Sequence, residues 1–121
     1  MKVLIVDDSK TMRTIIKGAL GKGGISDVLE AVNGKEAVSA VMTSDVDLIL
    51  MDWNMPEMSG LEAVKTIRAA GNDSTIMMVT TEAEKHRIIE ALQSGVNDYL
   101  VKPFTPDILL GKINKYVGKP V

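Results

Sequence analysis

Acidic, hydroxyl and amino side chains follow four separate apolar segments of this chain. Asp7 and Asp8 come directly after the first segment, and Asp52 comes directly after another. Thr80 ends a third segment, and Lys102 follows a fourth. In open α/β sheets, ligands bind outside the carboxyl ends of the strands. If the strand before Asp7 and Asp8 is the neighbour of the strand before Asp52, three carboxylates converge on one crevice with a hydroxyl and an ammonium group on its far side.

Three carboxylates in one crevice repel each other and raise one another's pKa values, so a divalent cation makes such a cluster tolerable. Mg²⁺ takes oxygen ligands, usually one or two carboxylates together with waters and phosphate oxygens. One carboxylate then remains free to act as a nucleophile, and a covalent aspartyl phosphate is a known outcome for such a group. Lys102 would place its charge on the phosphoryl oxygens, and Thr80 would donate a hydrogen bond to one of them.

Each of these residues also has an ordinary structural explanation. An Asp at a strand-to-helix turn is often a helix cap. A Thr at a strand end is commonly a loop hydroxyl, and a surface lysine is usually only solvated. The coincidence of four strand ends, and not any single residue, is what favours a functional site.

The elements that must position these side chains follow from apolar periodicity. Continuous apolar runs rich in Val and Ile suit strands that are buried on both faces, as in a parallel sheet. These runs are Val3–Val6, Leu48–Met51, Ile76–Val79 and Tyr99–Val101. A weaker run, Val28–Ala31, contains Glu30 and suits a half-exposed edge strand.

Between these runs, apolar residues recur at helical spacing. The helical positions are Met12, Ile15, Ile16, Ala19 and Leu20; Ala37, Val38, Val41 and Met42; Leu61, Val64 and Ile67; Ile88, Ala91 and Leu92; and Leu109, Ile113, Tyr116 and Val117. Ser9 can cap the first helix and Gly95 can close the fourth. Gly18 and Gly111 lie inside helices, each at a cost of about 1 kcal/mol relative to Ala. The alternating order predicts an α/β fold with one doubly wound, five-stranded parallel sheet and five helices.

Composition narrows the function classes further. The chain has 121 residues, of which 45% are hydrophobic and 25% charged, and this is typical of one globular domain. A net charge of −2 provides no basic field for nucleic acid or anionic lipid, and the lack of cysteine excludes disulfides and thiolate metal sites. The N-terminal apolar run is too short for a signal peptide, and no run approaches a membrane span. We therefore expect one cytoplasmic domain over residues 1–121, with 118–121 as a tail.

At these residues the sequence resembles the receiver domain of two-component response regulators, most closely its chemotaxis branch. The matching segments are Leu4–Ser9, Met51–Pro56 with Gly60, Met78–Thr80 and Tyr99–Phe104, and the resemblance spans essentially the whole chain. It implies the flavodoxin-like, or CheY-like, fold, whose sheet order 2-1-3-4-5 is carried over from the family. It also implies a single receiver (response regulatory) domain without an output domain.

The resemblance implies a role for each acidic residue. Asp52 would be the phosphoacceptor. Asp8 and Asp52 would ligate Mg²⁺ directly, together with the backbone carbonyl of Asn54. Asp7 would hold the ion mainly through water. The protein would not be an enzyme acting on other molecules, because it would catalyse only its own phosphorylation and dephosphorylation.

The resemblance further implies a switch. Thr80 and Lys102 would bind the phosphoryl group, and the Lys102–Pro103 peptide bond would be cis. Thr80 would move toward the phosphoryl group, and Tyr99 would turn inward behind it. The face formed by the fourth helix, fifth strand and fifth helix would then change its affinity for a partner. The expected partner surface includes Lys85, Ile88, Glu90, Tyr99 and Lys112 or their neighbours.

The expected partners are a histidine kinase of the chemotaxis type as phosphodonor, the flagellar motor switch protein as target, and a phosphatase. We expect a monomer that contacts neither nucleic acid nor membrane. Trp53 and Asn54 favour the chemotaxis branch, which commonly carries Asp-Trp-Asn-Met-Pro. Thr81 departs from the usual Ala of close relatives and could change the hydrolysis rate. The alternative within the family is a stand-alone receiver that serves a non-motor output or acts as a phosphorelay shuttle.

Two other protein classes use related features. A phosphatase of the haloacid dehalogenase type needs a general acid two residues after its nucleophile, where this chain has Asn54, which carries no catalytic proton. A flavodoxin-like nucleotide or flavin binder needs a Gly-, Ser- or Thr-rich phosphate loop after the first strand. This chain instead places Asp7 and Asp8 there, and these carboxylates repel phosphate. Both classes are therefore disfavoured.

Overall fold

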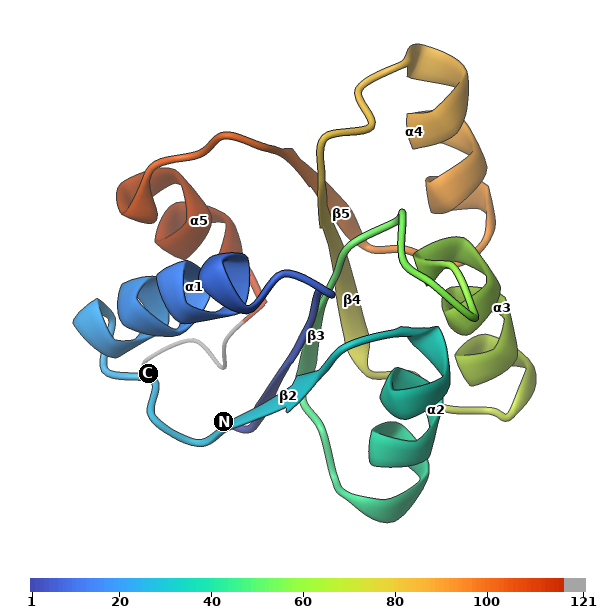
Figure 1. Cartoon of the computed structure of the whole chain (residues 1–121), viewed down its shortest axis with the longest axis horizontal. Coiled ribbons are helices and arrows are strands. Elements are labelled where there is room, and N and C mark those ends of the chain that lie inside the picture. Colours follow the sequence, from blue (N-terminus) through green and yellow to red (C-terminus); the bar gives the residue numbers. More distant parts are fainter. Residues whose placement is uncertain (117–121) are drawn as a thin grey trace.

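The computed structural model of the chain describes residues 1–116, and within them five strands alternate with five helices (Figure 1). In chain order these are β1 (Val3–Val6), α1 (Lys10–Lys22), β2 (Val28–Ala31), α2 (Gly34–Thr43), β3 (Leu48–Met51), α3 (Gly60–Ala69), β4 (Thr75–Thr80), α4 (Lys85–Gln93), β5 (Asp98–Val101) and α5 (Pro106–Ile113). The predicted α/β alternation is confirmed. Val117 and the expected tail over residues 118–121 lie outside the described residues.

All strand pairs are parallel, and the order across the sheet is β2-β1-β3-β4-β5, as the family resemblance implied. Strand β1 is therefore the neighbour of β3, which is the condition that the proposed crevice required. Val6 at the end of β1 pairs with Met51 at the end of β3, and Met51 pairs with Met78 of β4. The register thus aligns the carboxyl ends of the strands along one edge of the sheet.

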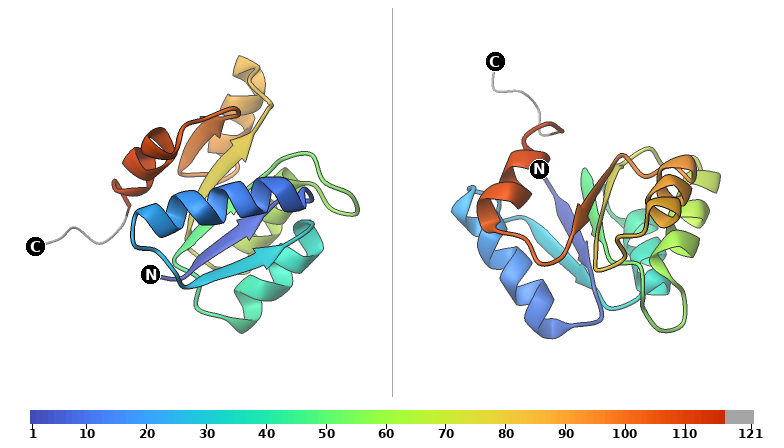
Figure 2. Two further views of the ribbon diagram at one scale, coloured as in Figure 1. Left: turned by 60° about the vertical axis from the view of Figure 1, so that its left-hand side comes forward. Right: turned by 90° about the horizontal axis from the view of Figure 1, so that it is seen from above.

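Helices cover both faces of the sheet. Helices α1 and α5 lie on one face, and α2, α3 and α4 lie on the other (Figures 1 and 2). Along β1, Val3 and Ile5 belong to the core beneath α1 and α5, while Leu4 and Val6 belong to the core on the opposite side. This alternation explains why β1 and β3 are apolar at every position: both of their faces are buried.

The observed element boundaries differ slightly from those predicted. Strand β4 spans Thr75–Thr80 instead of Ile76–Val79, because strand pairing tolerates Thr at both ends. Helix α5 ends at Ile113, although the apolar pattern continued to Tyr116. The chain there tightens into a turn in which Tyr116 N donates to Ile113 O, and the Tyr116 hydroxyl donates to the Asn97 carbonyl at 3.2 Å.

Side-chain caps begin four of the helices. Ser9 accepts a hydrogen bond from Met12 N at the start of α1, as predicted. Asn33, Ser59 and Thr105 do the same for α2, α3 and α5. Glu84, the N-cap residue of α4, makes no such bond. Among the described residues, no helix combines the length and the apolar character needed to cross a bilayer.

Candidate functional site

The carboxyl edge of the sheet brings the three acidic residues together. Asp52 N donates a 2.9 Å hydrogen bond to Val6 O, which fixes the end of β3 against the end of β1. One carboxylate oxygen from each of Asp7, Asp8 and Asp52 lies within 4.8 Å of the other two. Asp7 and Asp52 are buried, whereas Asp8 is exposed. The cluster is therefore a mainly buried acidic site with one side open to solvent.

Strands β4 and β5 supply the groups on the far side of the cluster. Lys102 N donates to Thr80 O at 2.8 Å, so the two residues leave the sheet together. The Lys102 ammonium lies 2.7 Å from Asp7 Oδ2 and 3.6 Å from Asp52 Oδ2. Thr80 is completely buried. The Lys102–Pro103 peptide bond is cis. The carboxylates, the hydroxyl and the ammonium thus lie close together at one edge of the sheet.

The electrostatics of the acidic cluster favour a bound cation. Burial raises the pKa of Asp52 above its usual range, and the nearby Asp7 charge raises this pKa further. The Lys102 ammonium and hydrogen bonds from Thr80 and Trp53 N oppose the rise without cancelling it. The charged form of Asp52 is therefore incompletely compensated by the protein's own groups, and a divalent cation would compensate it.

The donor set fits Mg²⁺. Carboxylate oxygens and backbone carbonyls are hard ligands of the kind that Mg²⁺ prefers, and one open side leaves room for the waters that it retains. Asp7 already accepts hydrogen bonds at both oxygens, from Ser9 N at 2.9 Å and from Lys102 Nζ. This leaves Asp7 less free to ligate directly than Asp8, which fits the indirect role implied by the family resemblance.

A glycine fixes the loop that carries Asp52. Gly60 N, at the start of α3, donates a 2.8 Å hydrogen bond to Trp53 O. A Cβ atom on Gly60 would collide with the backbone carbonyl of Asp52. Only glycine therefore allows α3 to begin directly against the backbone of Asp52.

The two expected switch residues, Thr80 and Tyr99, contact the same backbone segment. Glu82 N donates to Thr80 Oγ1 at 3.3 Å, and the Tyr99 hydroxyl donates to Glu82 O at 2.7 Å. Burial raises the pKa of Tyr99 to about 12, and the Glu82 charge adds to this rise. Thr81 lies between Thr80 and Glu82 in the sequence, and its side chain is exposed. It is the residue at which this chain departs from the usual Ala of close relatives. Thr80 and Tyr99 are thus joined through one residue, Glu82.

Sequence reasoning missed Glu82 and Arg87. The Glu82 carboxylate accepts a 3.1 Å hydrogen bond from Asn54 Nδ2, and the Arg87 guanidinium lies 5.3 Å from the centre of the Trp53 ring. Asn54 and Glu82 each lie two residues beyond Asp52 and Thr80, and this matched spacing could have indicated their contact. Arg87 gave no such signal, because its reach depends on the orientation of α4.

Only some residues of the expected partner surface are exposed and without intramolecular ion pairs among the described residues. On α4, Lys85 is exposed, whereas Ile88 and Glu90 are half-buried. On α5, Lys112 forms an ion pair with Asp98 at 3.3 Å. A partner that engages Lys112 would therefore compete with Asp98 for its ammonium.

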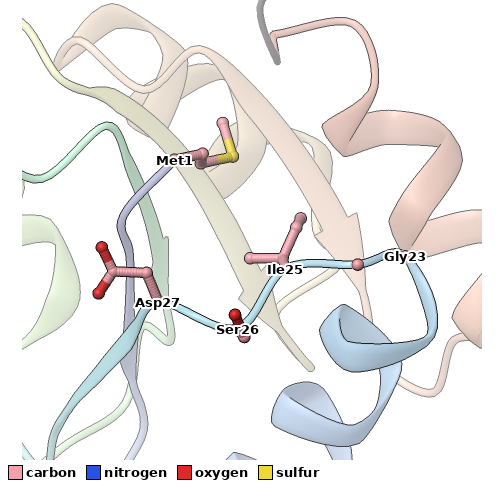
Figure 3. Close-up of a pocket in the computed structure, with 6 residues that line it drawn as sticks. Met1, Gly23, Ile25, Ser26 and Asp27 are labelled. Atoms are coloured by element: carbon pink, nitrogen blue, oxygen red, sulfur yellow. The ribbon is translucent and has the colours of Figure 1, made fainter.

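A separate hollow of about 330 Å³ lies at the other end of β1, between the end of α1 and the start of β2. Met1 and residues 23–27 line it, and Asp27 is the only carboxylate in this lining (Figure 3). It shares no residue with the acidic cluster and offers no second set of convergent charged groups.

Comparison with known proteins agrees with this geometry. The response regulator receiver domain family matches residues 3–114. The chain is 52% identical to the chemotaxis protein CheY homolog of Campylobacter jejuni, covering 98% of this chain and 93% of that protein. It is 49% identical to the chemotaxis protein CheY1 of Helicobacter pylori, covering 98% of both.

A solved structure shows the same arrangement of elements. The chemotaxis protein CheY4 of Vibrio cholerae superimposes with a TM-score of 0.88 at 36% identity, covering 96% of this chain and 98% of that one. The family match covers most of the chain, and the two curated relatives are similar along nearly their whole length. The chain therefore belongs to the response regulator receiver domain family and is similar to its CheY-type chemotaxis members.

Proposed function

We propose that Asp52 accepts a phosphoryl group from a histidine kinase in a Mg²⁺-dependent reaction, and that this modification changes the protein's affinity for a target. The observation that carries the proposal is the convergence of the three carboxylates with the Lys102 ammonium at one edge of the sheet. Such an arrangement neutralises negative charge around a nucleophile while keeping that nucleophile in place.

In the proposed reaction, an Asp52 carboxylate oxygen attacks the phosphorus of a phosphohistidine. The phosphorus–nitrogen bond breaks, and its electron pair stays on the imidazole of the donor. Lys102 and Thr80 bind the phosphoryl oxygens by charge and by hydrogen bonding. Asp8, Asp52 and the Asn54 carbonyl would hold Mg²⁺, with Asp7 acting through water. When bound, the ion neutralises charge on the phosphoryl oxygens.

The modification would act through Thr80 and Tyr99. A ligand shifts a two-state equilibrium only by its differential affinity for the two states. The Thr80 hydroxyl supplies this difference, because it would leave Glu82 N to reach a phosphoryl oxygen. Movement of Glu82 would in turn displace Tyr99, because the Tyr99 hydroxyl donates a hydrogen bond to the Glu82 carbonyl. The Thr80→Ala and Lys102→Ala proteins should therefore accept phosphate yet signal poorly.

The relatives named as chemotaxis proteins support the flagellar motor switch as the target, reached through the face of α4, β5 and α5. The alternative is a non-motor output or a phosphorelay shuttle. Purified motor switch protein should bind the beryllofluoride-activated domain more tightly than the untreated domain. Equal affinity in the two states would favour the alternative.

Labelling with acetyl phosphate and Mg²⁺ tests the central claim. Peptide mass spectrometry should find one base-labile phosphoryl group, on Asp52, and Asp52→Asn should lose it. Asp45→Asn, a change of the same kind at an exposed position, should be labelled normally. A stable label on His86, the only histidine, or on a serine would contradict the assignment.

A further inference from the structure

Helix α4 is the least supported helix of the described part of the chain. Its N-cap residue, Glu84, makes no side-chain capping hydrogen bond, unlike the N-cap residues of the other described helices, and Ala91 is its only buried residue. Its first turn contains Lys85, His86 and Arg87 and no acidic residue, although a helix N-terminus favours negative charge. Figure 1 shows α4 standing at the periphery of the molecule. Its position must therefore depend strongly on individual contacts.

Arg87 makes the contacts that tie the start of α4 to the functional site. Its guanidinium carbon lies 5.3 Å from the centre of the Trp53 ring. Its ion-pair distances, 3.8 Å to Glu82 and 3.9 Å to Glu90, are long, and exposed ion pairs contribute little. Trp53 is only 5% exposed, and a cation is attracted to the face of an indole ring. The stack on Trp53 is therefore the principal tether.

Trp53 is directly bonded to the phosphoacceptor. Its backbone N–H donates a 2.8 Å hydrogen bond to Asp52 Oδ1, in a buried setting. A covalent change on the Asp52 carboxylate alters the acceptor of this bond and hence the position of the Trp53 peptide. The Trp53 ring, on which the Arg87 guanidinium stacks, would move with this peptide. The path from Asp52 to α4 then has only two steps, one hydrogen bond and one cation–π contact.

We propose that Arg87 is a positioning residue that couples occupancy of the Asp52 site to the placement of α4 through its stack on Trp53. This inference rests on the proposed function and adds a connection separate from that of Thr80 and Tyr99. Because such coupling is reciprocal, a partner that holds α4 with Arg87 on Trp53 would also change the affinity of the Asp52 site for a phosphoryl mimic.

Hydrogen–deuterium exchange of residues 85–93, with and without beryllofluoride and Mg²⁺, tests the coupling. Arg87→Gln removes the cation, Arg87→Lys keeps it, and Lys65→Gln removes a charge from an exposed site on α3. We expect α4 amides of Arg87→Gln to exchange about 2–5-fold faster than those of the wild type, the factor that corresponds to one exposed cation–π contact. Their response to beryllofluoride should be largely lost.

Arg87→Lys should keep most of the wild-type protection and response, and Lys65→Gln should keep all of both. Beryllofluoride binding itself, followed by Trp53 fluorescence, should persist in every variant. Wild-type exchange and response in Arg87→Gln would overturn the coupling, as would Arg87→Lys behaving like Arg87→Gln, because a cation would then not be the feature required. Failure of the wild type to bind beryllofluoride would instead overturn the proposed function, and this inference with it.

Discussion

The Lys102 ammonium donates a 2.7 Å hydrogen bond to the Asp7 carboxylate, 95 residues earlier in the chain. Strands β3 and β4 lie between the two strands that end at these residues, so the lysine side chain reaches across the whole site. The exposed fractions of the two side chains are only 11% and 2%. This buried contact makes Lys102 the main counter-charge for Asp7 and Asp52 when no metal is bound.

Replacing Lys102 should therefore destabilise the metal-free protein more than the metal-bound one. Lys102→Ala leaves two buried carboxylates without their cation, which should lower the free energy of unfolding by about 1–3 kcal/mol in EDTA. Mg²⁺ would replace the lost charge and reduce this difference. Urea unfolding with EDTA or with Mg²⁺ measures both values, and Lys65→Ala serves as the exposed control. An equal loss in the two conditions would show that Lys102 does not compensate the carboxylates of the proposed metal site.

Magnesium should bind the acidic cluster and stabilise the fold. Binding to the native state alone adds about 1.4 kcal/mol at ten times the dissociation constant, which a thermal melt detects. Trp53 is the only tryptophan and is adjacent to Asp52, so its emission should change during the titration. Asp8→Ala should weaken binding strongly, while Asp45→Ala should bind normally. If calorimetry and fluorescence both remain unchanged on adding Mg²⁺, the metal site is wrong.

Most of the site's composition could be predicted because the chemical residues directly follow apolar strands. In a parallel sheet this spacing is enough to place Asp7, Asp52 and Lys102 at one edge, once the strand order is known. The order itself came from the family resemblance, since apolar runs do not say which strands are neighbours. The weak run with Glu30 was correctly predicted as an edge strand because a charge needs one open face.

The contacts around α4 could not be predicted from the sequence. They depend on the angle at which α4 leaves the β4–α4 loop, and no periodicity encodes this angle. Arg87 stacks on Trp53, and the spacing of these two residues in the sequence matches neither the period of a helix nor that of a strand. Likewise, the two hydrogen bonds of the Glu82 backbone arise from the local course of the loop.

Two helical glycines should be replaceable with a gain in stability. Among residues 1–116, a Cβ atom on Gly18 or Gly111 would meet no atom within 4 Å, and neither residue has a positive φ. Each Gly→Ala change removes backbone freedom from the unfolded chain and should raise the free energy of unfolding by about 0.5–1 kcal/mol. Chemical denaturation measures this gain. A loss of stability in either variant would show that the added methyl group meets a contact that the described residues do not include.

Gly60→Ala should have the opposite effect. The added methyl group would collide with the Asp52 carbonyl, so α3 or the Asp52 loop must move. We expect a loss of about 1–3 kcal/mol, typical of overpacking, together with weaker Mg²⁺ binding and slower labelling of Asp52. Gly18→Ala is the matched control, because it makes the same chemical change in open space. Normal labelling and stability in Gly60→Ala would show that the start of α3 does not constrain Asp52.

The Tyr99 hydroxyl should ionise at a higher pH than an ordinary tyrosine. Burial raises its pKa to about 12, while an unfolded tyrosine ionises near pH 10. The unfolded chain therefore releases this proton first as the pH rises. The contribution of Tyr99 to stability is complete below about pH 10 and decreases between about pH 10 and 12.

Ultraviolet absorbance titration can isolate this step because the chain has only two tyrosines. Burial, together with the nearby Asp98, also raises the pKa of Tyr116, so both tyrosines should ionise above the ordinary range. Tyr99→Phe should remove the step near pH 12 and leave that of Tyr116. The same variant loses the hydrogen bond to the Glu82 carbonyl, so its response to beryllofluoride at α4 should also change. If the step that disappears lies near pH 10, the Tyr99 hydroxyl is open to water and does not hold the β4–α4 loop.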